Sequence, residues 1–280
     1  MEPLINKLHR KGVVILDFGS QYTQLIARRV RELNVYSEIL PPETKLDRIK
    51  EIAPSAIILS GGPSSVFADE APNFDKKIFD IEVPILGICY GLQLLAHHHD
   101  GLVESNGQGE YGFAEIEIDD NKKLFQNVSK TSQVWMSHMD RVTKIPDGWH
   151  ALAHSSNGVI AAMSNQDQSI VATQFHPEVA HTEEGKIFLS NFLFKIANCS
   201  PTWTAGNFIE EQIKLIRNQV KEDKVIVGVS GGVDSTVVAA LLHKAIGDQS
   251  TAILIDHGML RLNEAKNCVK ALKDLSLIHI

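Results

Sequence analysis

The chain has 280 residues, of which 44% are hydrophobic and 22% are charged, proportions typical of a soluble globular protein that can bury a core. Its formal net charge of -7 argues against a broad nucleic-acid-binding surface, and its three widely spaced cysteines exclude a fully paired disulfide framework. No apolar run reaches the roughly 20 residues needed to span a bilayer, so we expect a cytoplasmic protein with neither membrane nor nucleic-acid partners.

The first half of the chain alternates between short apolar runs and helical patterns. Residues 13–16, 56–59 and 84–88 predict buried strands, and each run stops at a loop rich in glycine or small polar residues. Apolar spacing predicts helices over residues 22–33 and 92–97. This order is typical of an α/β fold with a mostly parallel sheet, in which ligands bind at the carboxyl ends of the strands.

The pattern changes further along the chain. Between Glu115 and Val171 shorter alternating segments predict a small antiparallel part, and residues 186–197 have helical spacing. Residues 198–202 read as a linker, after which the α/β alternation restarts. We therefore predict one domain over residues 11–200 and a second over residues 205–280.

The second domain is predicted from a new set of elements. Residues 208–220 form an amphipathic helical pattern, residues 225–229 a buried strand, and the helix that follows runs to Ala245. A further strand is predicted over residues 252–255.

Cys89 stands between a predicted strand and a predicted helix, in the sequence Gly87-Ile88-Cys89-Tyr90-Gly91. A strand-to-helix elbow exposes its central side chain in a strained conformation, and flanking glycines relieve the crowding. The start of the helix favours the thiolate, the reactive form of cysteine. An isolated cysteine is more often a small buried hydrophobe, but this glycine frame favours a nucleophile.

His176 follows an apolar strand and precedes Glu178 by two residues. A histidine in this position can act as a general base, with the carboxylate orienting the imidazole and stabilising its cation. Without other evidence, a histidine and a carboxylate at this spacing are often ordinary polar residues on the protein surface.

Together these motifs resemble the catalytic triad of class I glutamine amidotransferases. The resemblance implies that Cys89 attacks the side-chain amide of glutamine, that His176 transfers the proton to the departing ammonia, and that Glu178 supports the histidine. It also implies contacts to glutamine and an oxyanion hole to which the segment Ser60-Gly61-Gly62-Pro63 contributes. By itself this segment would be a simple turn. The residues implied for the oxyanion hole are Gly62 and Tyr90, and those for glutamine are Gln93, Ser137 and His138.

Three consecutive histidines, His97, His98 and His99, suggest a metal site. Consecutive side chains on a helix do not face one another, so we disfavour this hypothesis and predict no metal ligands.

A second motif lies at residues 230–236, between a strand and a helix, where backbone N–H groups and the helix dipole can bind phosphate. It lacks the Gly-Lys-Ser/Thr ending of the Walker loop, which disfavours kinase-like transfer. It resembles the loop of ATP pyrophosphatases, and residues 254–261 resemble the segment that follows the next strand in that family. The ATP-binding residues implied are Ser230, Gly231, Gly232, Val233, Asp234, Ser235 and Thr236; a helix-capping loop without nucleotide is the alternative.

The two domains in this order resemble the GMP synthetase family, and the phrases at residues 17–29 and 176–182 match it closely. The resemblance implies a carbon–nitrogen ligase of purine biosynthesis that uses glutamine, XMP and ATP with Mg²⁺, has no prosthetic group, and forms a homodimer through a further C-terminal domain. The fold implied for the second domain is a truncated, adenine-nucleotide α-hydrolase-like α/β domain. A non-catalytic binding module and a different amidotransferase with an incidental nucleotide domain remain alternatives.

The chain departs from the family at a few positions. Asp100, Gln108 and Ala180 replace residues that are usual there, but none belongs to the proposed triad. After Asp274 the resemblance stops, so we expect a truncated chain that acts as a glutaminase only.

Overall fold

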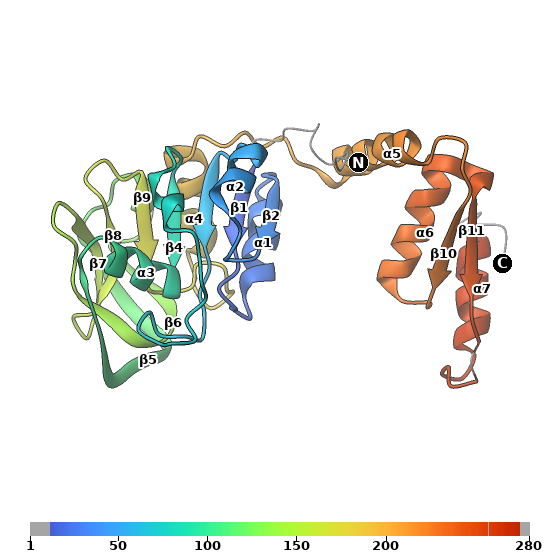
Figure 1. The fold of residues 1–280 in the computed structure, drawn as a ribbon. Helices are drawn as coiled ribbons and strands as arrows, with labels where there is room; N and C mark the ends of the chain where they lie inside the picture. The colour runs from blue at the N-terminus through green and yellow to red at the C-terminus, as the bar shows by residue number, and fades with distance from the viewer. Residues whose placement is uncertain (1–11, 257, 275–280) are drawn as a thin grey trace. The chain divides into compact units, whose positions relative to one another are not determined.

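The computed structural model describes residues 12–256 and 258–274; the ending at residues 275–280 and His257 lie outside this range. The chain divides into two compact units, with the division between Trp203 and Thr204. Figure 1 shows both units.

The first unit is built on one nine-stranded sheet with strand order β2-β1-β3-β4-β9-β8-β7-β5-β6. From β2 to β9 neighbouring strands are parallel, and from β9 to β6 they are antiparallel. In chain order its elements are β1 (Val13–Leu16), α1 (Thr23–Glu32), β2 (Ser37–Leu40), α2 (Leu46–Ile52), β3 (Ala56–Leu59), η2 (Lys76–Asp80), β4 (Ile85–Ile88), α3 (Tyr90–His98), β5 (Leu102–Ile118), η3 (Lys123–Phe125), β6 (Thr131–Lys144), β7 (His150–Ser155), β8 (Ile160–Ser164), β9 (Ile170–Thr173), α4 (Gly185–Asn191) and the π-helical turn η4 (Phe192–Ile196).

The central strands are buried on both faces, which explains why their sequences are continuously apolar. Val13 and Ile15 of β1 belong to a core that includes residues of α1 and α4, whereas Val14 and Leu16 belong to a core that includes residues of α2 and α3. Because successive side chains of a strand point to opposite faces, one short run supplies both cores. The predicted α/β fold with helices flanking a largely parallel sheet is confirmed.

Two differences from the sequence prediction concern strands at the sheet's borders. The antiparallel region begins at Leu102 rather than near Glu115, because β5 pairs along β6 as a long hairpin with an irregularity between Ser105 and Glu110. β2 was not predicted, since it is an edge strand with only Ser37 fully buried and so lacks an apolar run.

The second unit contains a parallel pair of strands, β10 and β11, with three α-helices and one short 3₁₀ helix among its described residues. Its elements are α5 (Ala205–Val220), β10 (Val225–Val229), α6 (Val233–Ile246), η5 (Gly247–Gln249), β11 (Ser250–Leu254) and α7 (Glu264–Asp274). β11 begins two residues before the predicted strand because the polar Ser250 and Thr251 pair in register with Val225 and Ile226. None of the helices in the described parts of the chain is long and apolar enough to cross a membrane.

Candidate active site

Four neighbouring parallel strands bring the predicted loops of the first unit to one edge of its sheet. β1, β3, β4 and β9 all end there, and the loops that follow carry Ser20, Gly61, Cys89 and His176. The amide of Cys89 donates to the carbonyl of Thr173, the last residue of β9, at 2.7 Å. The tertiary fold thus brings together residues that lie far apart in the sequence.

Cys89 occupies a strained elbow between β4 and α3. Its φ of 53° and ψ of -101° are unusual for a residue other than glycine, and α3 begins at the next residue. A Cβ at Gly87 would come within 2.7 Å of the backbone of Gly91, and one at Gly91 within 2.6 Å of the carbonyl oxygen of Leu59. Both flanking glycines are therefore required by packing.

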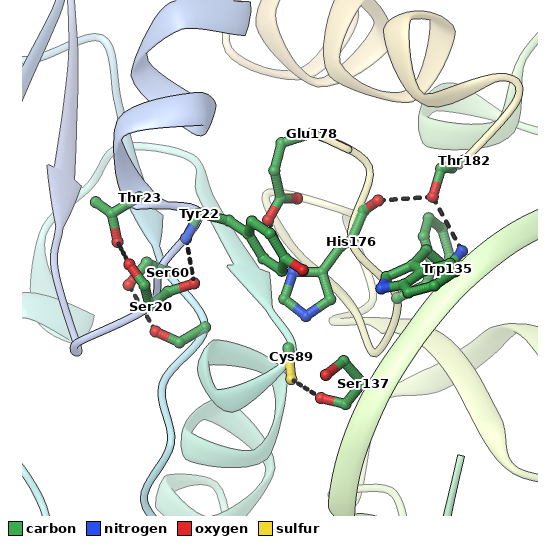
Figure 2. Close-up of polar contacts among 12 residues, drawn as sticks. Ser20, Tyr22, Thr23, Ser60, Cys89, Trp135, Ser137, His176, Glu178 and Thr182 are labelled. Carbon is green, nitrogen blue, oxygen red and sulfur yellow. Dashed lines mark hydrogen bonds and ion pairs between the residues drawn. The ribbon is translucent and has the colours of Figure 1, made fainter. Parts of the chain in front are cut away.

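The thiol of Cys89 faces β6 and the imidazole of His176, as Figure 2 shows. Its Sγ lies 3.5 Å from the carbonyl oxygen of Ser137, although only 5% of the residue is exposed. A Cβ at Gly61 would lie 3.1 Å from Cε1 of His176 and 3.6 Å from Cβ of Cys89. Gly61 thus leaves the space that these two side chains share.

His176 and Glu178 form a buried pair, with Nδ1 of the imidazole 2.7 Å from Oε1 of the carboxylate. Burial by itself lowers the pKa of His176, but the charge of Glu178 and the interactions with Cys89 outweigh it and raise the pKa to about 10. The raised pKa favours the imidazolium form of His176 beside the carboxylate of Glu178. The ring of Tyr22 contacts the imidazole edge-on, with 5.2 Å between centroids.

A pocket of about 520 Å³ opens beside the thiol, large enough for an amino acid. The predicted residues that line it are Gly62, Cys89, Gln93, Ser137, His138 and His176. Tyr90 begins α3 and is buried.

Two of the predicted glutamine contacts also have protein partners. Nε2 of Gln93 donates to the carbonyl oxygen of Asp140 at 2.8 Å. The ring nitrogens of His138 contact the carbonyl oxygen of Asp140 at 2.9 Å and Oε2 of Glu110 at 3.3 Å. His138 thereby lowers the pKa of Glu110. These bonds hold the wall of the pocket in place.

Sequence reasoning did not assign a role to several residues that surround the pair. Thr182 donates to the carbonyl of His176, and Arg29 donates through Nε to the carbonyl of Glu178 at 3.0 Å. Trp135 of β6 and Tyr22 complete the surroundings. Arg29 and Thr182 lie within the segments at residues 17–29 and 176–182 that closely match the GMP synthetase family. No other feature of the sequence pointed to them.

The consecutive histidines take part in aromatic packing. The ring centroids of His98 and Phe79 are 4.3 Å apart, and those of His99 and Trp149 are 5.0 Å apart. Burial lowers the pKa of both histidines. In residues 12–256 and 258–274 no group of three or more His, Cys, Asp or Glu side chains is arranged to hold a metal ion.

In the second unit, the loop at residues 230–236 joins β10 to α6. Gly231 has a φ of +80°, and the amide of Ser230 donates to Oγ of Ser235 at 3.1 Å. A cavity of about 430 Å³ beside the loop is lined by residues that include Gly231, Thr236 and Arg261. A glycine loop at a helix start with a nearby guanidinium is suited to phosphate.

Comparisons with known proteins find matches for both units. Residues 14–196 match the family model described as glutamine amidotransferase class-I, and residues 207–278 match the model described as NAD synthase. Glutamine-hydrolysing GMP synthases of Brachyspira hyodysenteriae and Wolinella succinogenes are 51% and 49% identical to the chain, each over 96% of its length. The alignments cover 53% and 52% of those relatives, so the chain spans about half their length.

Solved structures share the fold. A Thermoplasma acidophilum protein provisionally described as a GMP synthase subunit a has 29% identity and a TM-score of 0.59; the match covers 72% of this chain and 98% of that one. A Thermotoga maritima glutamine amidotransferase has a TM-score of 0.51 at 18% identity, covering 97% of this chain and all of that one, and supports the fold alone. Because the amidotransferase model matches well over half of the residues, the chain belongs to the class I glutamine amidotransferase family.

Proposed function

We propose that the first unit hydrolyses glutamine, with Cys89 as the nucleophile, His176 as the proton-transfer group and Glu178 as the carboxylate that orients it. One observation carries this proposal: a cysteine at a strained elbow borders a buried His–Glu pair and a pocket of about 520 Å³. The family membership supports it.

In the first step the sulfur of Cys89 attacks the side-chain amide carbon of glutamine, after its proton has passed to His176. The tetrahedral intermediate collapses when the C–N bond breaks, and the imidazolium gives its proton to the departing ammonia. Water then attacks the thioester, His176 accepts a proton from it, and the C–S bond breaks to release glutamate. The raised pKa of His176 suits the first step, because the imidazolium is the proton donor.

The negative charge that develops on the amide oxygen must be stabilised by hydrogen-bond donors. We assign these to the backbone N–H groups of Gly62 and Tyr90, next to the elbow. We assign the binding of the substrate's amino-acid end to Gln93, Ser137 and His138, which line the pocket.

In the second unit we propose that residues 230–236 bind the phosphates of ATP. The left-handed Gly231 turns the backbone at the start of α6, and Arg261 lines the adjacent cavity. Mg²⁺ would neutralise the phosphates when bound, as it commonly does in enzymes that act on ATP.

For the whole protein, we propose that the ammonia is used in the ATP-dependent amination of XMP to GMP. The names of the relatives with about 50% identity support this assignment over another amidotransferase. The homodimer and the cytoplasmic location expected from the sequence stay predictions.

Glutaminase activity can be tested on the purified chain by measuring glutamate and ammonia after addition of glutamine. We expect equimolar release, and its loss in Cys89→Ala, because this substitution removes only the sulfur atom. Unchanged thermal unfolding of the variant would show that the loss is chemical. Glutamate release by Cys89→Ala at more than a few per cent of the wild-type rate, roughly a 1.5–2 kcal/mol difference in activation free energy, would contradict the proposed role.

A further inference from the structure

Thr182 attaches the loop that carries His176 and Glu178 to strand β6. Its Oγ1 donates to the carbonyl oxygen of His176 at 2.6 Å and accepts from the amide of Trp135 at 3.1 Å (Figure 2). Thr182 is only 3% exposed. One hydroxyl thus bridges two backbone groups that belong to different segments.

The position of β6 explains why this bridge is needed. β6 is the last strand of the sheet, so the backbone groups on its outer side have no neighbouring strand to pair with. The carbonyl of Trp135 accepts from the amide of His176 at 3.1 Å, and that of Gln133 accepts from the amide of Glu183 at 3.2 Å. The loop therefore takes the place of a strand, and Thr182 supplies the partner for the remaining N–H group of Trp135.

The same strand contacts the thiol. Two residues beyond Trp135, the carbonyl oxygen of Ser137 lies 3.5 Å from Sγ of Cys89. The hydroxyl of Thr182 thus joins the backbone of His176 to the strand that the sulfur of Cys89 contacts.

We propose that Thr182 is a positioning residue that holds His176 in register with Cys89; this inference rests on the proposed glutaminase function. Thr182 does not act on the substrate directly. It lines a separate cavity of about 340 Å³ with Arg29 and Lys186, rather than the pocket beside the thiol.

Two substitutions separate the hydroxyl from the shape of the side chain. Thr182→Val keeps the shape and removes both hydrogen bonds, whereas Thr182→Ser keeps the hydroxyl. Because small displacements of a catalytic group can cost about 100-fold in rate, we expect Thr182→Val to lower kcat by roughly 10- to 100-fold. KM for glutamine should change less than about threefold, since Thr182 does not line the substrate pocket, and Thr182→Ser should stay near wild type.

Ser37→Ala is the matched control for the loss of a buried hydroxyl. Ser37 is fully buried in β2 and donates to the carbonyl of Ala27 at 3.2 Å, away from the thiol. All three tryptophans, Trp135, Trp149 and Trp203, lie in the first unit, so their fluorescence measures its folded fraction. We expect Ser37→Ala to lose stability while kcat per folded molecule is unchanged.

The rate of alkylation of Cys89 by iodoacetamide, measured against pH, gives a second readout that needs no turnover. Displacement of the imidazole from the sulfur should shift this profile in Thr182→Val and leave it in place in Thr182→Ser and Ser37→Ala. If Thr182→Val folds too poorly, Thr182→Cys, with a weaker donor of similar size, should show an intermediate kcat.

Wild-type kcat and an unshifted alkylation profile in folded Thr182→Val would overturn the positioning role. Equal losses in Thr182→Val and Thr182→Ser would also overturn it, because Thr182→Ser keeps the hydroxyl and the effect would then not follow the hydroxyl. If the wild-type chain released no glutamate, the proposed function itself would fail, and the alkylation profiles alone would decide the role of Thr182.

Discussion

Nδ1 of His176 lies 2.7 Å from Oε1 of Glu178, and both side chains are almost completely buried. Oε2 of the same carboxylate has no hydrogen-bond partner among the described residues. The pair therefore depends on this single contact, because a buried carboxylate without a partner is strongly unfavourable.

The two members of the pair should differ in their effect on glutamine hydrolysis. His176→Asn retains a donor near Glu178 but loses the nitrogen that faces Cys89, so we expect kcat to fall by about 10³-fold or more. Glu178→Gln keeps the size and removes the charge, and should cost less than His176→Asn, because Glu178 orients the base without exchanging protons with the substrate. A larger loss of kcat in Glu178→Gln than in His176→Asn would reverse the assigned roles.

The stability of the first unit should fall as the pH rises from 6.5 to 10. The pKa of His176 is raised from 6.5 to about 10 on folding, so in this interval the folded state binds more protons than the unfolded chain. The stabilisation is complete below pH 6.5 and is lost as the pH approaches 10. Urea unfolding followed by tryptophan fluorescence should show a steeper decline in the wild type than in His176→Asn; parallel declines would disprove the linkage.

Gly87→Ala should destabilise the first unit and disrupt the elbow. The new Cβ would meet the backbone of Gly91 at 2.7 Å, and we expect a cost of about 3 kcal/mol or more. Gly148→Ala is the control, because Gly148 has a φ of +77° but open space around it and should cost only about 1 kcal/mol. Equal changes in the urea midpoint would show that the elbow tolerates a side chain.

Gly231→Ala should weaken ATP binding by the chain, as measured by equilibrium dialysis. The φ of +80° is unfavourable for alanine, so we expect the phosphate-binding loop to lose its conformation and affinity to fall by about 5- to 10-fold. Gly247→Ala is the control for backbone strain. Gly247 also has a positive φ, but it lies in open space at the other end of α6. If both variants bound ATP equally well, the loop would not be the phosphate site.

The sequence by itself determined the α/β class and most central elements. The strands β3 and β10 are both short apolar runs followed by glycine loops, and this pattern needs no tertiary information. Only β3 is buried, however; the prediction of a buried strand over residues 225–229 was wrong, because Ile226 of β10 is exposed. The elbow at Cys89 was also predicted, because its glycines are a local requirement. The edge strand β2 was missed, since an exposed face allows polar residues.

Only the tertiary structure decided how Cys89, His176 and Thr182 lie relative to one another. Cys89 and His176 meet because β4 and β9 are neighbours in the sheet although β5 to β8 separate them in the chain. Thr182 contacts Trp135 because β6 is an edge strand with unpaired backbone groups. No periodicity or spacing in the sequence marks a hydroxyl that pairs with the backbone of an edge strand, because the sheet topology decides which strand lies at the edge.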